Sequence, residues 1–197
     1  MSLIGASVVR KEDPKLLQGK GHFTDDINTV NTVYAKFVLS DIPHAHLKTI
    51  NVSRAVKLKG VHGVYTIHDF NEFPDLPGPD DMQRPVLARN KVVYVGEPVA
   101  LVIAETQALA EDAVDQVEIE YDPLPVMTTI NEALSSDAEP IISSLDSNIT
   151  QHVPMLDDLE KELSKPKFRE HLRITNNRCA PCPIEPMSCL VEWCEGN

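Results

Sequence analysis

The sequence predicts an α+β fold, in which short strands are mixed with a few helices. Short β-branched and apolar runs bounded by turn residues recur between residues 33 and 121, which is typical of strands. Helical spacing of apolar residues is confined to a few segments such as Gln107–Gln116. Apolar residues make up 42% of the 197 residues but aromatic residues only 5%, so we expect a core of Val, Ile, Leu and Ala.

The first half of the chain contains three expected strands and one short helix. The strands are Val33–Leu39, Ile50–Val52 and Val61–Ile67. Between the last two, Ser53 is expected to cap a short helix that stops at Gly60. Asn71–Arg84 holds three prolines and has no periodicity, which predicts a loop.

The middle of the chain reads as strand, helix and strand. Val92–Val95 and the continuously apolar Val99–Ala104 are predicted strands, the second buried on both faces. Thr106 is expected to cap the helix Gln107–Gln116. Val117–Tyr121 alternates as a half-buried strand does, and Asp122-Pro123 should end it. We expect this run to form one right-handed crossover in a partly parallel sheet.

The last third is less regular. Thr129–Glu132 has the capping-box form and predicts a short helix to Leu134. Ser135–Val153 is linker-like. The one-faced spacing of leucines in Leu156–Leu163 predicts another helix, and Phe168–Ile174 alternates as a strand. The predicted organisation is therefore a domain over residues 1–134, a linker with a short helix over 135–167, and a fragment of a second domain over 168–197.

Charge and composition narrow the function classes. The formal net charge is −12, and residues 101–197 hold 6 Lys and Arg against 19 Asp and Glu. Such an acidic half repels phosphate backbones, so no nucleic-acid partner is expected. The longest apolar run has six residues, so no membrane partner is expected. The start of the chain lacks the pattern of a signal peptide, and all four cysteines fall in the last 19 residues, which favours a cytoplasmic location.

Several phrases, in order and spacing, carry a family resemblance. They are Val9–Pro14, Leu17–Gly21, Phe23–Asp26, Ser40–His46, Gly60–Val64, Pro85–Ala88, Val92–Ala104 and Glu118–Pro125. Together they resemble the N-terminal region of the large, molybdenum-containing subunit of the xanthine dehydrogenase, aldehyde oxidase and carbon monoxide dehydrogenase family. The resemblance covers residues 4–134 and resumes at Phe168–Pro186, where Asn177–Pro186 is similar to the opening of the next, larger domain.

The resemblance implies an α/β-hammerhead domain that precedes two large domains holding a molybdopterin cofactor. Complete enzymes of this kind hydroxylate aldehydes, purines or other heterocycles, or oxidise carbon monoxide, and pass electrons to iron–sulfur clusters and FAD on partner subunits or domains. Their cofactor-holding residues and the glutamate base lie beyond the stretch present here. We therefore predict no catalytic residue, no cofactor-binding residue and no bound cofactor in this chain, which is not expected to be active alone.

The function expected from this resemblance is that of a non-catalytic N-terminal module, or a truncated form, of a molybdenum hydroxylase large subunit. Its expected partners are the remaining large-subunit domains and the flavin and iron–sulfur subunits, with a homodimer also possible. One alternative is a stand-alone interaction or scaffold protein without the catalytic domains. The other is a small metal-binding protein that uses its cysteine-containing tail.

The metal alternative depends on Cys179, Cys182, Cys189 and Cys194. A CxxC turn can aim two thiolates at one zinc ion or iron–sulfur cluster. However, the second pair is more widely spaced, neither turn contains glycine, and the family has ordinary residues at the matching positions. The favoured interpretation is therefore that these are incidental cysteines and that the chain holds no metal site.

Histidine and carboxylate pairs offer weaker candidates. In an extended chain His44 and His46 would lie on one side, as a metal site requires, but no third ligand is identifiable. Glu12-Asp13 and Asp25-Asp26 pair two carboxylates, which can serve acid–base chemistry when their environments differ. Both pairs are more typical of turns, and the histidines are expected to have a structural role.

Overall fold

The computed structural model describes residues 4–27, 29–78, 83–151, 167–168, 170, 172–177, 179–185 and 187–194. The expected helix Leu156–Leu163 lies outside these residues. Contacts divide the chain into two compact units. One comprises Met1–Thr32 and Phe168–Asn197, and the other comprises Val33–Lys167.

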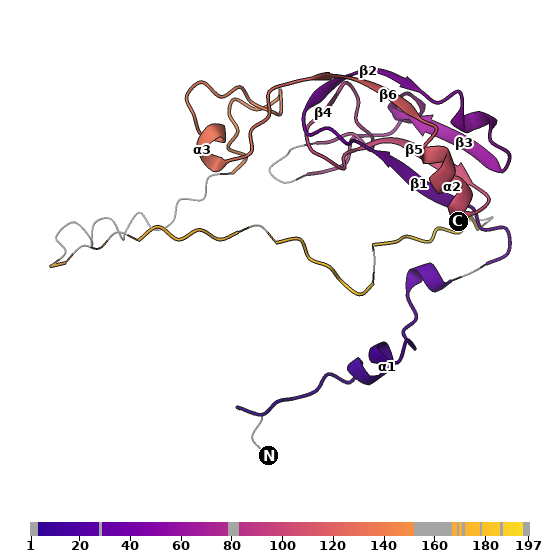
Figure 1. Ribbon diagram of the computed structural model, residues 1–197, viewed down its shortest axis with the longest axis horizontal. Coiled ribbons are helices and arrows are strands. Elements are labelled where there is room, and N and C mark those ends of the chain that lie inside the picture. The colour runs from indigo at the N-terminus through magenta and orange to yellow at the C-terminus, as the bar shows by residue number, and fades with distance from the viewer. Residues whose placement is uncertain are drawn as a thin grey trace. The chain divides into compact units, whose positions relative to one another are not determined.

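The unit Val33–Lys167 is built on two small sheets (Figure 1). The first sheet has the order β1 (Tyr34–Leu39), β5 (Pro98–Ala104), β3 (Val61–Thr66). The second has the order β4 (Lys91–Val92), β2 (Ala45–Asn51), β6 (Glu118–Pro123). Every strand pair is antiparallel. Short strands and few helices confirm the predicted α+β class.

The main helix, α2 (Gln107–Val114), covers one face of the first sheet. The Thr106 side chain accepts a hydrogen bond from the Leu109 N–H, so the predicted cap is confirmed. The helix contacts β1, β5 and β3, and its Ala110 and Ala113 are buried against Ala100, Val102 and Ala104 of β5. A second buried cluster, comprising Ala45, Ala88, Val92 and Val99, lies at the second sheet.

The remaining helical segments are short. They are α1 (Asp13–Leu17), η1 (Thr24–Asp26), η2 (Ala55–Lys57), η3 (Ile67–Phe70) and α3 (Ile130–Ala133). The capping box of Thr129 and Glu132 at the start of α3 is present as predicted. The predicted cap at Ser53 is wrong: η2 follows Arg54, and the Ser53 hydroxyl donates instead to Asn51 Oδ1.

The predicted parallel crossover is also wrong. β5 and β6 lie in different sheets, because β6 pairs with β2 while β5 pairs with β1 and β3. Asp122 and Pro123 do not stop the strand at Tyr121, since β6 continues to its last residue, Pro123. Pro123 pairs with Ala45 on an edge strand, where a residue without an N–H is tolerated.

Two expected strands have other bounds, and a third is not formed in the described residues. The expected strand Val92–Val95 is reduced to β4, since the Val93 N–H is taken by the Glu97 side chain. The expected Ile50–Val52 is the end of the longer β2, which runs between two partners. The described residues of Phe168–Ile174 are exposed and pair with no strand, so that prediction is wrong where it can be checked.

Candidate functional site

The segment Ser40–His46, which leads from β1 to β2, forms a tight junction with the turn before β5. Ser40 is buried, with 2% of its surface exposed. Its N–H donates to Glu97 O at 2.9 Å, and its carbonyl accepts from the Gly96 N–H at 2.7 Å. These bonds extend the pairing of β1 with β5 beyond the regular strand ends.

The Ser40 side chain also forms hydrogen bonds within the same segment. Its hydroxyl donates to Ile42 O at 2.8 Å and accepts from Ile42 N–H at 3.2 Å. The Tyr121 hydroxyl lies buried beside Ser40. Burial is the largest effect on its pKa and raises the pKa of Tyr121, while the neighbouring Ser40 hydroxyl lowers it. Ser40 is the one buried polar residue in the part of the chain that the structure describes, and its side chain shapes a turn.

His44 and His46 do not form a pair of free ligands. The His44 Nδ1–H donates to Pro125 O at 2.7 Å, which ties the segment to the end of β6. Its Nε2 is buried and has no hydrogen-bond partner in the described part of the chain. His46 is exposed on β2. The structural role expected for His44 is confirmed by this contact.

Glu97 is an acid with a shifted pKa at the junction, and it lies within the family phrase Val92–Ala104, although the sequence did not single it out as a candidate site residue. Its Oε2 accepts from the Val93 N–H at 2.6 Å. Burial is the largest effect and raises the pKa of Glu97, whereas backbone N–H bonds from Val93 and Tyr94 and the charges of Arg84 and Lys91 lower it. A carboxyl with a raised pKa is a candidate acid or base when it faces a pocket. Here it closes the turn between β4 and β5.

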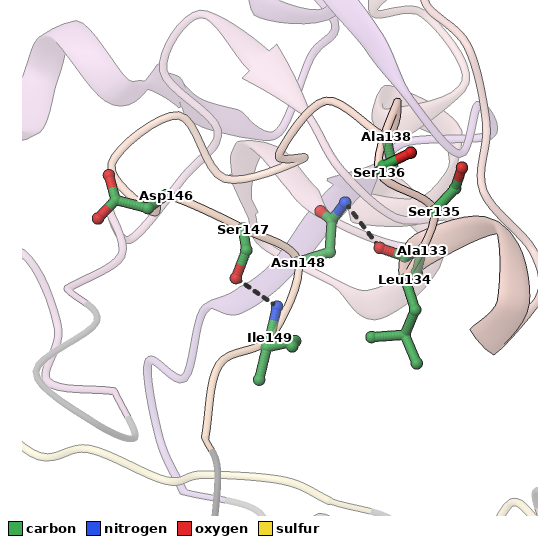
Figure 2. Close-up of a pocket in the computed structure, with 9 residues that line it drawn as sticks. All are labelled: Ala133, Leu134, Ser135, Ser136, Ala138, Asp146, Ser147, Asn148 and Ile149. Atoms are coloured by element: carbon green, nitrogen blue, oxygen red, sulfur yellow. Dashed lines mark hydrogen bonds between the residues drawn. The ribbon is translucent and has the colours of Figure 1, made fainter.

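A shallow hollow lies among residues 133–149 (Figure 2). Asn148 organises it: its Oδ1 accepts from Ile141 N–H at 2.9 Å, and its Nδ2 donates to Glu139 O at 3.1 Å and to Ala133 O at 3.4 Å. Lys91 Nζ also donates to Ile141 O and to Ser143 Oγ, which ties this irregular segment to β4.

The hollow does not fit a molybdopterin. Its volume is 240 Å³, below the roughly 300–1,000 Å³ of ligand pockets. A pterin that carries a phosphate also requires cations or convergent N–H donors. The charged residue in the lining is Asp146, whose carboxylate would repel a phosphate.

The paired acids act as turn residues. In the unit that holds the N-terminal segment, Asp13 begins α1 and pairs with Arg10 Nε at 3.2 Å. Asp26 Oδ2 accepts from the Phe23 N–H at 2.9 Å and so closes η1. This agrees with the interpretation favoured from the sequence.

The four cysteines are exposed thiols. Cys179 and Cys182 lie near backbone carbonyls of their own segment, at 3.8 Å from Asn177 O and Ala180 O respectively. Among the described residues, no three His, Cys, Asp or Glu side chains lie close enough together to hold a metal ion. The described helices likewise include none with the length and apolar content needed to cross a bilayer.

Comparison with known proteins identifies relatives of this arrangement. The family described as "Aldehyde oxidase and xanthine dehydrogenase, a/b hammerhead domain" matches residues 18–125, more than half of the chain. The chain is 32% identical to the nicotine 6-hydroxylase large subunit of Paenarthrobacter nicotinovorans, over 98% of this chain and 25% of that protein. It is 31% identical to the carbon monoxide dehydrogenase large chain of Afipia carboxidovorans, over 95% of this chain and 25% of that one.

Solved structures of proteins similar to this chain agree with the family match. Quinoline 2-oxidoreductase from Pseudomonas putida 86 matches with a TM-score of 0.64 and 32% identity, over 75% of this chain and 20% of that one. A Cu,Mo-containing carbon monoxide dehydrogenase matches with a TM-score of 0.60 and 35% identity, over 68% of this chain and 17% of that one. The chain therefore spans about a quarter of the curated relatives named above.

Proposed function

The chain belongs to the aldehyde oxidase and xanthine dehydrogenase family, in the α/β-hammerhead region of its molybdenum-binding large subunit, and we propose that it serves there as a non-catalytic structural module. The observation that carries the proposal is the length of the relatives that the chain matches. Nearly the whole chain aligns with one quarter of two relatives, and its polar side chains are used for turns and caps.

The junction supports a structural role. The buried hydroxyl of Ser40, the His44 imidazole and the Glu97 carboxylate each hold a backbone group of a neighbouring turn or strand end. Such internally engaged groups are not free to bind substrate or to transfer a proton to it. The proposed module instead presents a fixed arrangement of two sheets to the rest of its enzyme.

The proposed cofactors and partners follow from the relatives. One solved relative contains molybdenum and copper, and another relative is named as a subunit of a dehydrogenase complex. We assign the molybdopterin to the parts of the large subunit that the relatives have beyond the matching quarter, since the hollow in this chain does not fit it. The partners would be those parts together with flavin and iron–sulfur subunits.

A chimera tests this proposal. This chain would replace the matching quarter of the Afipia carbon monoxide dehydrogenase large chain, expressed together with the other subunits of that enzyme. We expect the chimera to assemble and to hold molybdenum, and the isolated chain to hold none. Stoichiometric molybdenum and aldehyde or carbon monoxide oxidation by the isolated chain would overturn the proposal, and so would a chimera that fails to assemble.

A further inference from the structure

Among the residues that the structure describes in the unit Val33–Lys167, a helix covers only one face of the sheet formed by β1, β5 and β3. Successive strand residues point to opposite faces. On β5, Ala100, Val102 and Ala104 point to α2 and are buried. Leu101 and Ile103 therefore point to the other face, where they are only partly buried. α2 lies over the buried face of this sheet (Figure 1).

The second face, which we call the open face, consists of two apolar rows across the three strands. Leu101 is paired with Phe37 on one side and Tyr65 on the other. Ile103 is paired in the same way with Ala35 and Gly63. Two of these side chains are large and exposed: 48% of Phe37 and 36% of Tyr65 are accessible.

The edges of the open face add to its apolar character. Leu39, which follows Phe37 by two residues on β1 and so shares its face, is 52% exposed. Lys36, which precedes Phe37, points the other way and pairs with Glu111 of α2 at 3.0 Å. The two paired rows contain no charged side chain.

Gly63 keeps the open face flat. The Tyr65 ring lies directly over it: a Cβ at position 63 would stand 2.8 Å from Tyr65 Oη and 2.9 Å from two ring carbons. The aromatic ring thus lies along the sheet rather than standing on it. A flat, uncharged surface of this kind is suited to packing against another layer of secondary structure.

The second sheet shows what a solvated face looks like in the same chain. On β6 the core-facing Ile119 and Tyr121 alternate with exposed Glu118 and Glu120. Glu118 pairs with Arg54 at 2.7 Å. Antiparallel sheets with one wet face have this alternation, and the open face departs from it.

We propose that the open face is the surface on which this module packs against the rest of a molybdenum hydroxylase large subunit, through an uncharged, mainly aliphatic surface of that partner. This inference rests on the proposed function. The curated relatives named above continue for about three times the length that this chain spans, which supplies a covering layer within one polypeptide.

Area and charge favour this partner over a second copy of the chain. The exposed apolar surface of the open face is on the order of 300 Å², which is below the roughly 800 Å² per partner of stable independent complexes. A domain in the same polypeptide needs less contact area, because its tether supplies a high effective concentration. Two copies, each with a net charge of −12, would also repel each other.

The chimera with the Afipia large chain allows a direct test by nitration of tyrosines with tetranitromethane, located by mass spectrometry. We expect Tyr65 to be nitrated in the isolated chain, where it is 36% exposed, and to lose that reactivity in the chimera. Equal nitration of Tyr65 in the two proteins, in a chimera that assembles and holds molybdenum, would overturn the inference and leave the proposed function standing.

A substitution gives a second measurement. Phe37→Thr introduces a β-branched residue, which suits a strand, and removes the aromatic ring from the open face. It should lower the unfolding temperature of the chimera by more than that of the isolated chain. The matched control is Ile130→Thr on α3, an apolar site that is 72% exposed and lies outside the open face. It should shift the two proteins equally.

The remaining outcomes separate the possible occupants. If Phe37→Thr, like Ile130→Thr, lowers the unfolding temperature of the chimera and of the isolated chain by the same amount, the inference fails. If the isolated chain sediments as a dimer that Phe37→Thr dissociates, the occupant is a second copy and the inference fails. If the chimera does not assemble or hold molybdenum, the proposed function fails.

Discussion

Replacing Ser40 by alanine tests the junction between β1 and β5. The Ser40 hydroxyl makes two hydrogen bonds to the backbone of one residue: it donates to Ile42 O at 2.8 Å and accepts from Ile42 N–H at 3.2 Å. Ser40 is 2% exposed, so water cannot easily take the place of the lost hydroxyl. Ser40→Ala leaves both groups of Ile42 without this partner.

The expected loss in the free energy of unfolding follows from these contacts. Each intramolecular hydrogen bond contributes about 0.5–1.5 kcal/mol, so the two together contribute about 2 kcal/mol. For a protein of this size, that corresponds to a fall in Tm of roughly 4–8 °C. The matched control is Ser53→Ala, which removes an exposed hydroxyl bonded to Asn51 Oδ1 at 2.6 Å and should cost less than about 0.5 kcal/mol.

Urea unfolding followed by far-ultraviolet circular dichroism measures both variants. If Ser40→Ala and Ser53→Ala destabilise the protein equally, the hydroxyl of Ser40 does not hold the junction and the reasoning is refuted. A change of the urea slope in Ser40→Ala alone would indicate a looser native state instead of a simple loss of two bonds.

Three further variants test other parts of the unit. Burial raises the pKa of Glu97 above its ordinary 4.5, so the contribution of Glu97 to stability is present below pH 4.5 and is lost as the pH rises through the folded-state pKa. The variant Glu97→Gln should therefore be more stable than the wild type at pH 7 and lose this advantage near pH 4.5. A difference in unfolding free energy that stays constant with pH in urea titrations would contradict this. Asn148→Ala should speed proteolysis within residues 133–149, since it removes the contacts to Ala133, Glu139 and Ile141, whereas Ser147→Ala should not. Gly60→Ala should lower the unfolding free energy by about 1–2 kcal/mol, because φ is +89° there and a Cβ would stand 2.8 Å from Leu109 Cδ1; an unchanged Tm would refute it.

Much of the local structure follows from short sequence patterns. The cap of α2 at Thr106 and the capping box of Thr129 and Glu132 involve residues three positions apart, so their partners are fixed by the sequence itself. The apolar run Val99–Ala104 correctly predicts the most buried strand, but the expected burial on both faces is wrong, because Leu101 and Ile103 are only partly buried on the open face. The ordered family phrases predict the hammerhead region that the comparisons show.

Several features that the sequence did not predict depend on which strands are neighbours. Alternation in β6 was a signal against a central parallel strand, because such strands are apolar on both faces. The shortened β4 depends on Glu97, which lies four residues beyond Val93 and takes its N–H. The role of His44 depends on Pro125 O, which only the pairing of β2 with β6 brings within reach.

The sequence by itself determined the family, the α+β class, the helix caps and the strand that forms the core, because these depend on composition, ordered phrases and residues a few positions apart. Only the tertiary structure decided the two-sheet arrangement, the junction at Ser40 and the open face. The open face requires Phe37, Tyr65 and Leu101 to meet from three strands, and that meeting is set by backbone pairing between distant segments. No local pattern specifies such pairing, since each strand alone could place its apolar side chains toward either face.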